Sequence, residues 1–342
     1  MSEPPASKPE PSEPVIRWGI AGPGRIAESV AGDFARTPGA ELTAVGSRSA
    51  ERAQAFARRH GAAHAHGSYA ELIQDPEVDV VYVATPHPQH RDIAVAALRA
   101  GKGVLVEKAF TATVAGAHDI VTTAHATGGF AMEAMWTRFQ PAVVRLRQLL
   151  ADGAIGTVLS VQADLGVLRD YDPRDRLFDP ALAGGAVLDL GVYVVSFAQM
   201  ILGTPERVVA AGTIGPSGVE IDAAMLLGFG GGATATLTIS LHSPMPGQAR
   251  VFGTAGWIDV LPRFHHPDQI VLHRPGVDAE TITAPHIGGG YAHELIEVTE
   301  CISAGRGESA VMPLADSVTV QNVLNEVLGQ LGIHPAEADD VV

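Results

Sequence analysis

Two different hydrophobic patterns divide the chain. Up to about residue 137, short apolar runs rich in β-branched residues alternate with alanine-rich segments of helical spacing. The run 78–85 predicts a buried strand, 92–99 a helix and 103–106 a further strand. This alternation is typical of an α/β domain of the Rossmann type, a doubly wound parallel sheet with helices on both faces.

Beyond residue 138, apolar and polar residues alternate with a period of two. In 233–242, hydroxyl side chains share one face, and the other face carries Ala233, Ala235, Leu237, Ile239 and Leu241. Further strands are predicted at 156–167, 207–214, 221–229, 249–253, 257–261 and 269–273. We therefore expect a second domain of the α+β class, built on a large, mostly antiparallel, open-faced sheet.

Four segments of helical spacing are long enough to cover one face of this second sheet: 139–152, 185–202, 291–304 and 315–331. The other face is then free to pack against a second copy of the chain. We accordingly expect a homodimer or homotetramer formed through the open face. The predicted domains are 15–138, which binds a dinucleotide, and 139–342, which binds substrate and forms the oligomer.

Composition narrows the class of protein. The chain has 342 residues, of which 46% are hydrophobic and 18% charged, enough for two globular domains. A net charge of −15 argues against nucleic acid or an anionic membrane as the partner. The single cysteine, Cys301, cannot form an internal disulfide, which favours a cytoplasmic location.

The first fourteen residues are rich in proline and polar side chains. They have neither the basic start nor the apolar stretch of a signal peptide, and we expect 1–14 to be a disordered tail. Elsewhere, no apolar run free of charges reaches the roughly 20 residues that a membrane span needs. The sequence therefore predicts no membrane partner.

Glycines end the first apolar run, in the segment Gly22-Pro-Gly24-Arg25-Ile26-Ala27. Gly22 allows a sharp exit from the strand, and Gly24 lets backbone amides approach a pyrophosphate. Small Ala27 lets the following helix pack close to the sheet. We expect the cofactor to contact Gly22, Gly24, Arg25 and Ile26, although a glycine triplet alone is weak evidence.

The end of the second strand, Gly46-Ser47-Arg48, lacks the acidic residue that normally holds the ribose 2′-hydroxyl of NAD. A hydroxyl next to a guanidinium suits a 2′-phosphate instead, and Arg52 follows one helical turn later. The sequence thus favours NADP(H) over NAD(H), with the phosphate held by Ser47, Arg48 and Arg52. The alternative is that both arginines are ordinary solvated charges at the start of a helix.

An acid and a lysine, Glu107 and Lys108, follow the strand 103–106. The carboxyl ends of parallel strands form the ligand-binding edge of such a sheet. A lysine there can exchange protons with a bound group. Taken alone, such a pair is more often an exposed surface ion pair.

Asp189 and Tyr193 lie four residues apart in a segment that starts at Gly184-Gly185, a spacing that puts both on one face of a helix. A tyrosine hydroxyl can pass a proton to or from a substrate oxygen, and a carboxylate can orient a sugar hydroxyl or the lysine. The alternative is a buried, hydrogen-bonded tyrosine beside a helix-end aspartate.

The histidines do not form a compact ligand set with carboxylates or thiolates in the sequence, so we expect no metal site. His87 and His90 follow the strand that ends at Thr85 and are placed near cofactor or substrate. His64 and His66 are expected at the surface, and the pair 265–266 and His286 are given no role. The segment 288–291, Gly-Gly-Gly-Tyr, precedes a predicted helix and suits either an anion or a flexible lid.

Together these motifs resemble the Gfo/Idh/MocA family of NAD(P)-dependent sugar and polyol oxidoreductases, from residue 15 to about 335. The resemblance is carried by Gly22-Pro-Gly24-Arg25-Ile-Ala27, Ser47-Arg48, Ala84-Thr85-Pro86-His87-Pro-Gln-His90, Glu107-Lys108, Met132-Glu-Ala-Met135-Trp136-Thr137-Arg138-Phe139, and Gly184-Gly185 through Asp189 to Tyr193. Residues 135–139 and Tyr193 are most similar to the branch that contains dimeric dihydrodiol dehydrogenase and NADP-dependent D-xylose 1-dehydrogenase.

The resemblance implies hydride transfer between nicotinamide C4 and a carbinol carbon of a sugar, cyclic polyol or diol, the small-molecule substrate. It implies that Lys108 is the catalytic lysine, that Tyr193 is its acid/base partner, and that Asp189 lies beside the substrate. It also implies that the nicotinamide end is lined by Thr85, His87, Glu107, Trp136 and Arg138. Pro86, His90 and Lys108 complete the expected cofactor-binding residues.

Two positions depart from the family pattern. Ala109 stands where many relatives have proline, and Tyr193 where many have histidine. Two other functions also stay open, a reductase of a keto-sugar, imine or tetrapyrrole, and a non-catalytic NADP-binding regulator. The joint presence of Lys108, Asp189 and Tyr193 disfavours a regulator, which would not need all three.

Overall fold

The computed structural model describes residues 15–342, so the predicted tail 1–14 lies outside the described residues. The first part of the chain forms a parallel sheet of six strands in the order β3-β2-β1-β4-β5-β6. Its strands are β1 (Ile16–Ala21), β2 (Ala40–Gly46), β3 (His64–His66), β4 (Val80–Val83), β5 (Gly103–Glu107) and β6 (Ala131–Ala134). The order is that of a dinucleotide-binding Rossmann sheet, as the hydrophobic pattern predicts.

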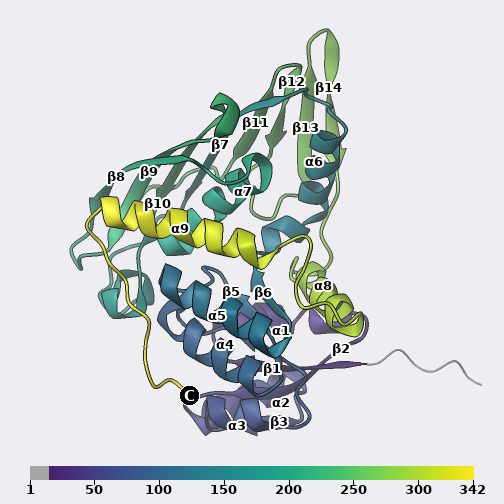
Figure 1. Ribbon diagram of the computed structural model, residues 1–342, viewed down its shortest axis with the longest axis vertical. Coiled ribbons are helices and arrows are strands. Elements are labelled where there is room, and N and C mark those ends of the chain that lie inside the picture. The colour runs from purple at the N-terminus through teal and green to yellow at the C-terminus, as the bar shows by residue number, and fades with distance from the viewer. Residues whose placement is uncertain (1–14) are drawn as a thin grey trace, which may run out of the picture.

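Helices cover both faces of this sheet (Figure 1). They are α1 (Arg25–Ala31), α2 (Ala50–His60), α3 (Tyr69–Gln74), α4 (His90–Arg99) and α5 (Val114–Thr127). Three of them begin at a hydroxyl cap, because Ser49, Ser68 and Thr113 accept hydrogen bonds from amides in the first turn. Apart from Arg17, the side chains of β1 and β4 are buried, with Trp18 in the core on one side of the sheet and Val81 in the core on the other.

The second sheet has eight strands in the order β14-β13-β12-β11-β7-β10-β9-β8. The strands are β7 (Val158–Gly166), β8 (Arg207–Ile214), β9 (Glu220–Gly228), β10 (Thr234–Ser240), β11 (Ala249–Gly253), β12 (Gly256–Val260), β13 (Gln269–Arg274) and β14 (Val277–Thr283). Neighbours pair antiparallel except β10 and β7, which run parallel. The large, mostly antiparallel sheet is therefore confirmed.

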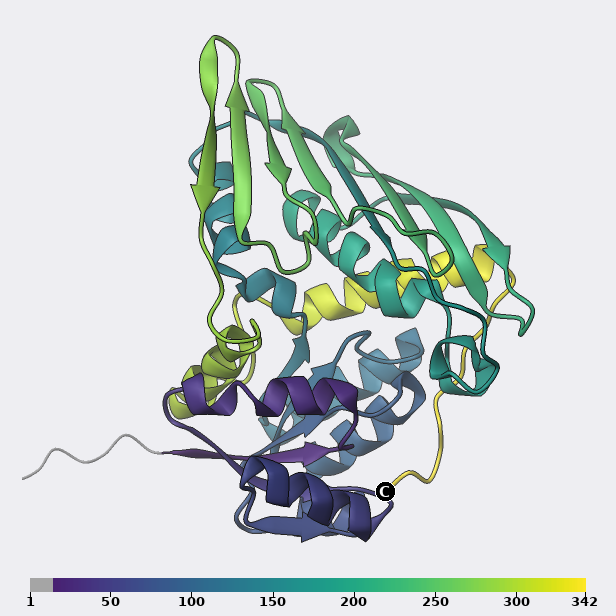
Figure 2. The ribbon, with the colours of Figure 1, turned by 180° about the vertical axis from the view of Figure 1, so that it is seen from behind.

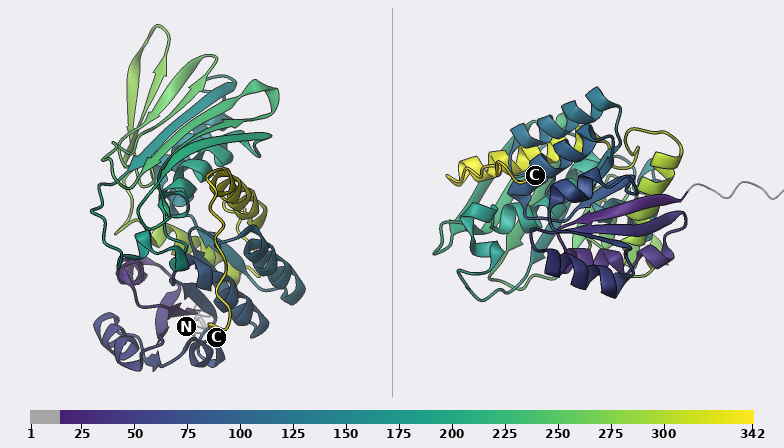
Figure 3. Two further views of the ribbon diagram at one scale, coloured as in Figure 1. Left: turned by 90° about the vertical axis from the view of Figure 1, so that its left-hand side faces the viewer. Right: turned by 90° about the horizontal axis from the view of Figure 1, so that it is seen from below.

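One face of the second sheet is covered by α6 (Pro141–Ala151), α7 (Val192–Leu202) and α9 (Leu314–Gln330). Helices α7 and α9 lie between the two sheets (Figure 2). The opposite face carries no helix in the described part of the chain (Figure 3). Apolar side chains alternate towards the helices, such as Leu237 and Ile239 of β10.

The helix α8 (Ala292–Ser303) corrects one expectation from the sequence. It was expected to cover the second sheet, but it packs against β1 and β2 of the parallel sheet. Its buried face carries Leu295 and Val298, which join the core around Trp18. The helical period reveals which face of α8 is apolar, and it does not reveal the sheet that this face meets.

The C-terminal segment also returns to the parallel sheet, as the yellow trace in Figure 1 shows. The amide of Ala338 donates to the Pro88 oxygen at 2.8 Å, and that of Val341 to the Asp92 carboxylate at 2.8 Å. The last part of the chain therefore fastens the two sheets together.

The segment Pro180–Leu202 is long and apolar enough to cross a membrane by composition alone. However, 72% of its most apolar window is buried inside the fold, and α7 packs on β7 and β10. Its apolar character is therefore explained by its place in the core.

Candidate active site

A cleft of about 760 Å³ opens between the two sheets. Its floor is the carboxyl edge of the parallel sheet, and its opposite wall comes from the end of β7 and the start of α7. Charged side chains of both signs line it: Arg25, Glu107, Lys108, Arg169, Asp175, Arg176, Asp189 and Arg263. The cleft lies where ligands bind in doubly wound folds.

The glycine turn forms one end of this cleft. Gly22 has φ +94°, and a Cβ there would lie 2.9 Å from Thr85 Cγ2, so the turn excludes larger residues. Gly24 lines the cleft with nothing within 4 Å of an added Cβ, which leaves its backbone open to a ligand. Arg25 and Ile26 line the cleft at the start of α1. This open backbone cradle fits the pyrophosphate of a dinucleotide.

The end of β2 places Ser47 and two arginines beside that turn. Ser47 is buried, and its hydroxyl accepts a hydrogen bond from the Ser49 amide at 3.2 Å. Arg48 and Arg52 are exposed, and Arg52 Nη2 donates to the Pro23 oxygen at 3.4 Å. Both cations act on the Tyr69 hydroxyl: burial raises the pKa of Tyr69, and the two arginines counteract this. The described residues therefore bring two guanidiniums together at this point.

The segment after β4 supplies the next part of the floor. Thr85, Pro86 and His87 line the cleft, and the buried Thr85 hydroxyl has no partner within residues 15–342. Burial lowers the pKa of His87 to about 3, so this imidazole is neutral. His90 lies behind them, fully buried, with Nε2 2.8 Å from the Thr85 oxygen and Nδ1 3.1 Å from the Ala109 oxygen. His90 thus positions the segments that carry Thr85 and Lys108.

Glu107 and Lys108 lie at the end of β5. Glu107 is buried; its carboxylate accepts hydrogen bonds from the Tyr82 hydroxyl at 2.5 Å and from the Lys108 amide at 3.1 Å. Burial raises the pKa of Glu107, while the Lys108 ammonium opposes that shift. The Lys108–Ala109 peptide bond is cis. The pair is therefore not an exposed surface ion pair, since Lys108 is only 13% exposed.

Lys108 meets Asp189 and Tyr193 from the opposite wall. Lys108 Nζ donates to the main-chain oxygen of Asp189 at 2.8 Å, and it lies 3.5 Å from the Asp189 carboxylate. It is also 4.6 Å from the centroid of the Tyr193 ring. The three residues that the sequence singled out for proton transfer are thus brought together across a separation of about 80 residues in the chain.

Charge and burial set the protonation of the partners. Burial alone would raise the pKa of the Asp189 carboxyl, but Lys108 and Arg176 hold it well below its usual range. Arg176 Nη2 donates to Asp189 Oδ1 at 2.9 Å. Burial raises the pKa of Tyr193 well above its ordinary value, with Glu107 and Asp189 adding to the shift. Asp189 is therefore ionised and Tyr193 protonated near neutral pH.

The segment that carries Asp189 begins differently from a regular helix. Val187–Gly191 forms a π-helical turn, and α7 starts at Val192. Glu220 of β9 fixes the start of this turn: its completely buried carboxylate accepts a hydrogen bond from the Val187 amide at 2.7 Å. Gly185, with φ +118°, makes room for that carboxylate, because a Cβ there would overlap it. Sequence reasoning missed Glu220, and only the Gly184-Gly185 pair hinted at a close approach.

Aromatic side chains close the cleft around Tyr193. The His265 ring lies 5.0 Å from the Tyr193 ring, and burial lowers the pKa of His265 to about 3, leaving it neutral. Trp136 stacks on Tyr291 at 4.4 Å with an angle of 6° between the rings. Of this pair, Tyr291 lines the cleft. The sequence assigned no role to His265, because nothing in its local pattern connects it with Tyr193.

Arg138 lies away from the position that the family resemblance implies. It is buried, and its guanidinium pairs with Asp316 Oδ2 at 2.5 Å and with Gln199 Oε1 at 2.6 Å. These contacts tie α7 to the start of α9. Arg138 is therefore not among the residues that line the cleft, and its contact with the nicotinamide stays a prediction.

The amides at the loop 288–291 bind an anionic group of the same chain, the Asp33 carboxylate. The Asp33 carboxylate accepts hydrogen bonds from the amides of Gly289 at 2.9 Å, Tyr291 at 2.9 Å and Ala292 at 3.2 Å. Asp33 itself is buried, in the turn after α1. The carboxylate therefore holds Tyr291 at the edge of the cleft.

Comparison with known proteins agrees with this arrangement. Residues 16–134 match the model of an oxidoreductase family with an NAD-binding Rossmann fold, and residues 143–259 match the GFO/IDH/MocA C-terminal domain. The chain is 36% identical to a trans-1,2-dihydrobenzene-1,2-diol dehydrogenase of Mus musculus, over 93% of this chain and 97% of the relative. It belongs to the GFO/IDH/MocA family.

Two solved structures share the whole architecture. The aldose-aldose oxidoreductase of Caulobacter crescentus, complexed with glycerol, is 27% identical with a TM-score of 0.84, covering 92% of this chain and 97% of that one. The 3-ketoreductase KijD10 of Actinomadura kijaniata, in complex with NADP and TDP-benzene, is 26% identical with a TM-score of 0.83, covering 92% and 98%. The protein is thus an NAD(P)-dependent oxidoreductase, and the residues around Gly24 and Thr85 fit its cofactor.

Proposed function

We propose that the protein is an NADP(H)-dependent dehydrogenase that transfers a hydride between nicotinamide C4 and a carbinol carbon of a diol, sugar or cyclic polyol. The proposal rests on one observation above all: the Lys108 ammonium lies between Asp189 and the Tyr193 ring, at the carboxyl edge of the parallel sheet. The bound nicotinamide supplies hydride chemistry, and the side chains supply proton transfer and orientation.

Each member of this group has a distinct role. Lys108 and Tyr193 exchange the proton of the reacting hydroxyl, and the protonated Tyr193 hydroxyl donates to the substrate oxygen. The ionised Asp189 orients Lys108 and accepts from a neighbouring substrate hydroxyl. The aromatic rings of Tyr291 and His265 line the reacting end and limit the access of water to it. A diol or polyol suits this arrangement, since it offers one hydroxyl to Lys108 and another to Asp189.

The relatives support the same substrate class. One is named for a trans-dihydrodiol, and structural neighbours are named for aldoses and for a 3-keto group. All three names concern a carbon that bears a hydroxyl or carbonyl oxygen. We therefore extend the reaction class, and not any individual substrate, to this chain.

The preference for NADP(H) is supported by the end of β2. Ser47 follows Gly46 where an acidic residue would hold a ribose hydroxyl, and Arg48 and Arg52 converge there beside Pro23. Two guanidiniums match the charge of a 2′-phosphate and its capacity to accept paired hydrogen bonds. The 3-ketoreductase neighbour also holds NADP.

A substrate panel tests the proposed function. Purified protein is mixed with NADP or NAD and with trans-dihydrodiols, aldoses and cyclic polyols, and absorbance at the nicotinamide band is followed. We expect turnover with NADP and at least one member of the panel, and turnover at least about 100-fold slower with the Lys108→Ala variant. NADP binding without turnover on any member, in either direction, would favour the regulator alternative.

Reduction of a keto-sugar is a second candidate, favoured by the 3-ketoreductase neighbour. Both candidates use the same residues, because a dehydrogenase and a reductase differ only in the direction of hydride transfer. The panel separates them when keto-sugars are offered with NADPH. Turnover of a keto-sugar with NADPH, with no turnover of the dihydrodiols, aldoses or cyclic polyols with NADP, identifies a keto-sugar reductase.

We further propose that the uncovered face of the second sheet binds another copy of this chain. Val209, Leu226 and Trp257 point away from α7 and α9 and are 42%, 50% and 37% exposed. Apolar side chains of this kind on one open sheet are typical of an oligomer interface. The single thiol, Cys301, is buried and free, which suits the cytoplasmic location that we propose.

A further inference from the structure

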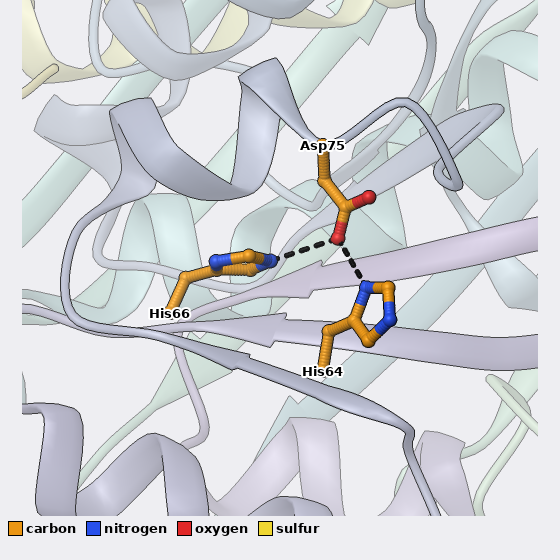
Figure 4. Close-up of side chains that lie close together, drawn as sticks. All are labelled: His64, His66 and Asp75. Carbon is orange, nitrogen blue, oxygen red and sulfur yellow. Dashed lines mark hydrogen bonds and ion pairs between the residues drawn. The ribbon is translucent and has the colours of Figure 1, made fainter.

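Two histidines and an aspartate converge at the edge of the parallel sheet, outside the cleft (Figure 4). His64 and His66 are two residues apart in β3, so both side chains lie on the same side of the strand. His64 Nδ1 lies 2.6 Å and His66 Nε2 2.8 Å from one carboxylate oxygen of Asp75, which follows α3. From the sequence, both histidines are expected at the surface; in the structure they join Asp75 in one cluster.

We propose that His64, His66 and Asp75 form a binding site for a divalent transition-metal ion such as Zn²⁺. Their three donor atoms lie within 4.8 Å of one another, and two imidazoles with one carboxylate are a common donor set for such ions. Bonds of about 2.0–2.2 Å in a tetrahedral site separate ligand atoms by about 3.3–3.6 Å. The two imidazoles therefore need to move away from the Asp75 oxygen by about 0.5–1 Å to admit the ion.

Neighbouring groups hold the proposed ligands in place by hydrogen bonds and charge. Glu77 Oε2 lies 3.1 Å from His64 Nε2, the ring nitrogen that faces away from the proposed ion. The other Asp75 oxygen accepts a hydrogen bond from the Glu77 amide at 2.9 Å. Lys102 Nζ donates to the main-chain oxygen of Asp75 at 2.8 Å, which fixes the loop itself.

The site is accessible from solvent and can keep open coordination positions. The side chains of His64 and His66 are 35% and 23% exposed, whereas that of Asp75 is 4% exposed. A buried carboxylate below two partly exposed imidazoles leaves the outer side of the ion to water. A three-ligand site with water is thus the geometry that the cluster supports.

The site also adjoins the proposed 2′-phosphate pocket. The Ser47 amide donates to the His66 oxygen at 3.2 Å, and β3 pairs with the last residues of β2. An ion at His66 therefore holds the strand on which the loop with Ser47 and Arg48 rests. This is a structural role for the metal, independent of the reaction proposed for the cleft.

Titration calorimetry with ZnCl₂ on the full-length, tag-free, metal-stripped protein tests the proposal. We expect one saturable equivalent in the unmodified protein, and loss of that equivalent in His64→Ala and in His66→Ala. Glu77→Gln keeps all three ligands and should weaken binding about 10- to 100-fold. His125→Ala is the matched control, because His125 is an exposed histidine on α5 and should leave the binding unchanged.

Cobalt(II) provides a second readout that does not depend on heat. Its visible d–d absorption should appear with the unmodified protein, be displaced by Zn²⁺, and be absent in both histidine variants. If no saturable equivalent forms, or if His64→Ala and His66→Ala bind Zn²⁺ as well as the unmodified protein, the proposal is wrong. The cluster would then be a hydrogen-bonded clamp that only ties β3 to the loop at Asp75.

Discussion

Lys108 donates a 2.8 Å hydrogen bond to the main-chain oxygen of Asp189, from the end of one sheet to a helical turn that packs under the other. The bond joins the parallel sheet to the wall proposed to hold the substrate. Because Lys108 Nζ also lies 3.5 Å from the Asp189 carboxylate, the ammonium is positioned both by backbone and by charge. Such positioning is what the proposed transfer of a proton by Lys108 requires.

Lys108→Ala should lower kcat by about 10²- to 10⁴-fold, the usual range for the loss of a general acid or base. NADPH affinity should stay nearly unchanged, because the side chain faces Asp189 and Tyr193 and not the glycine turn. Stopped-flow turnover and NADPH fluorescence titration measure the two quantities. Lys108→Arg is the companion variant: it keeps the positive charge, cannot give up its proton, and should be nearly as inactive. Full activity of either variant would remove Lys108 from the mechanism.

Arg48→Ala should weaken NADP(H) about 10- to 100-fold, because charge-assisted hydrogen bonds to a phosphate are each worth roughly 1.5–3 kcal/mol. Affinity for NAD(H) should remain the same. Binding of each cofactor is measured by fluorescence titration at fixed ionic strength. Arg58→Ala is the control, since Arg58 is exposed near the other end of α2. Equal losses for both cofactors in Arg48→Ala would contradict the phosphate assignment.

Glu220 makes stability depend on pH. Burial raises the pKa of its carboxyl from 4.5 to about 7, so between these values the folded chain keeps a proton that the unfolded chain loses. The stabilisation is complete below pH 4.5 and is lost as the pH rises to about 7, a change on the order of 3 kcal/mol. Above that pH the contribution is constant.

Glu220→Gln should remove this pH dependence while keeping an oxygen to accept from the Val187 amide. Urea unfolding at pH 5 and pH 8 measures the free energies. We expect the unmodified protein to lose more stability than the variant between the two values. Identical pH profiles would show that Glu220 keeps its ordinary pKa.

The parts of this fold that were predicted from sequence are those set by local pattern. The strand β10 and the turn at Gly22 are each determined by residues that are neighbours in the sequence, and both appear where expected. β14 was missed because it is an edge strand with almost every side chain exposed, so it has no apolar alternation. Its position follows from pairing with β13 alone.

The missed site residues depend on contacts between distant parts of the chain. Glu220 reaches Val187 from 33 residues away, and Arg138 pairs with Asp316, 178 residues further on. No period or motif near Arg138 identifies such a partner. The family pattern locates a residue along the chain, whereas the direction of its side chain is decided by the packing around it.

Leu226→Glu should disrupt the proposed oligomer. Leu226 is 50% exposed on the uncovered face of the second sheet, and a carboxylate there would have to be desolvated in the interface. Light scattering after size exclusion should show a higher oligomer for the unmodified protein and a monomer for the variant. Val144→Glu, on the exposed side of α6, should not change the mass. A monomeric unmodified protein would refute the interface.

Asp33→Ala should destabilise the fold by about 3 kcal/mol or more. It removes a buried carboxylate on which the Gly289, Tyr291 and Ala292 amides converge, and hydrogen bonds to charged acceptors are each worth roughly 1.5–3 kcal/mol. Asp92→Ala is the matched control: its carboxylate also accepts from two amides, those of Val341 and Val342, but it is less buried and should cost less.

The same change should also reach the cleft, because Asp33 holds the loop that delivers Tyr291 to its edge and to the face of Trp136. At a temperature where the Asp33→Ala variant is still folded, its KM for substrate should be higher than that of the unmodified protein. The effect on kcat should be smaller, because the substitution leaves Lys108 and Tyr193 in place. Urea unfolding and steady-state kinetics separate the two consequences. A variant that loses stability but keeps its KM would show that Tyr291 contributes to the fold without shaping the substrate site.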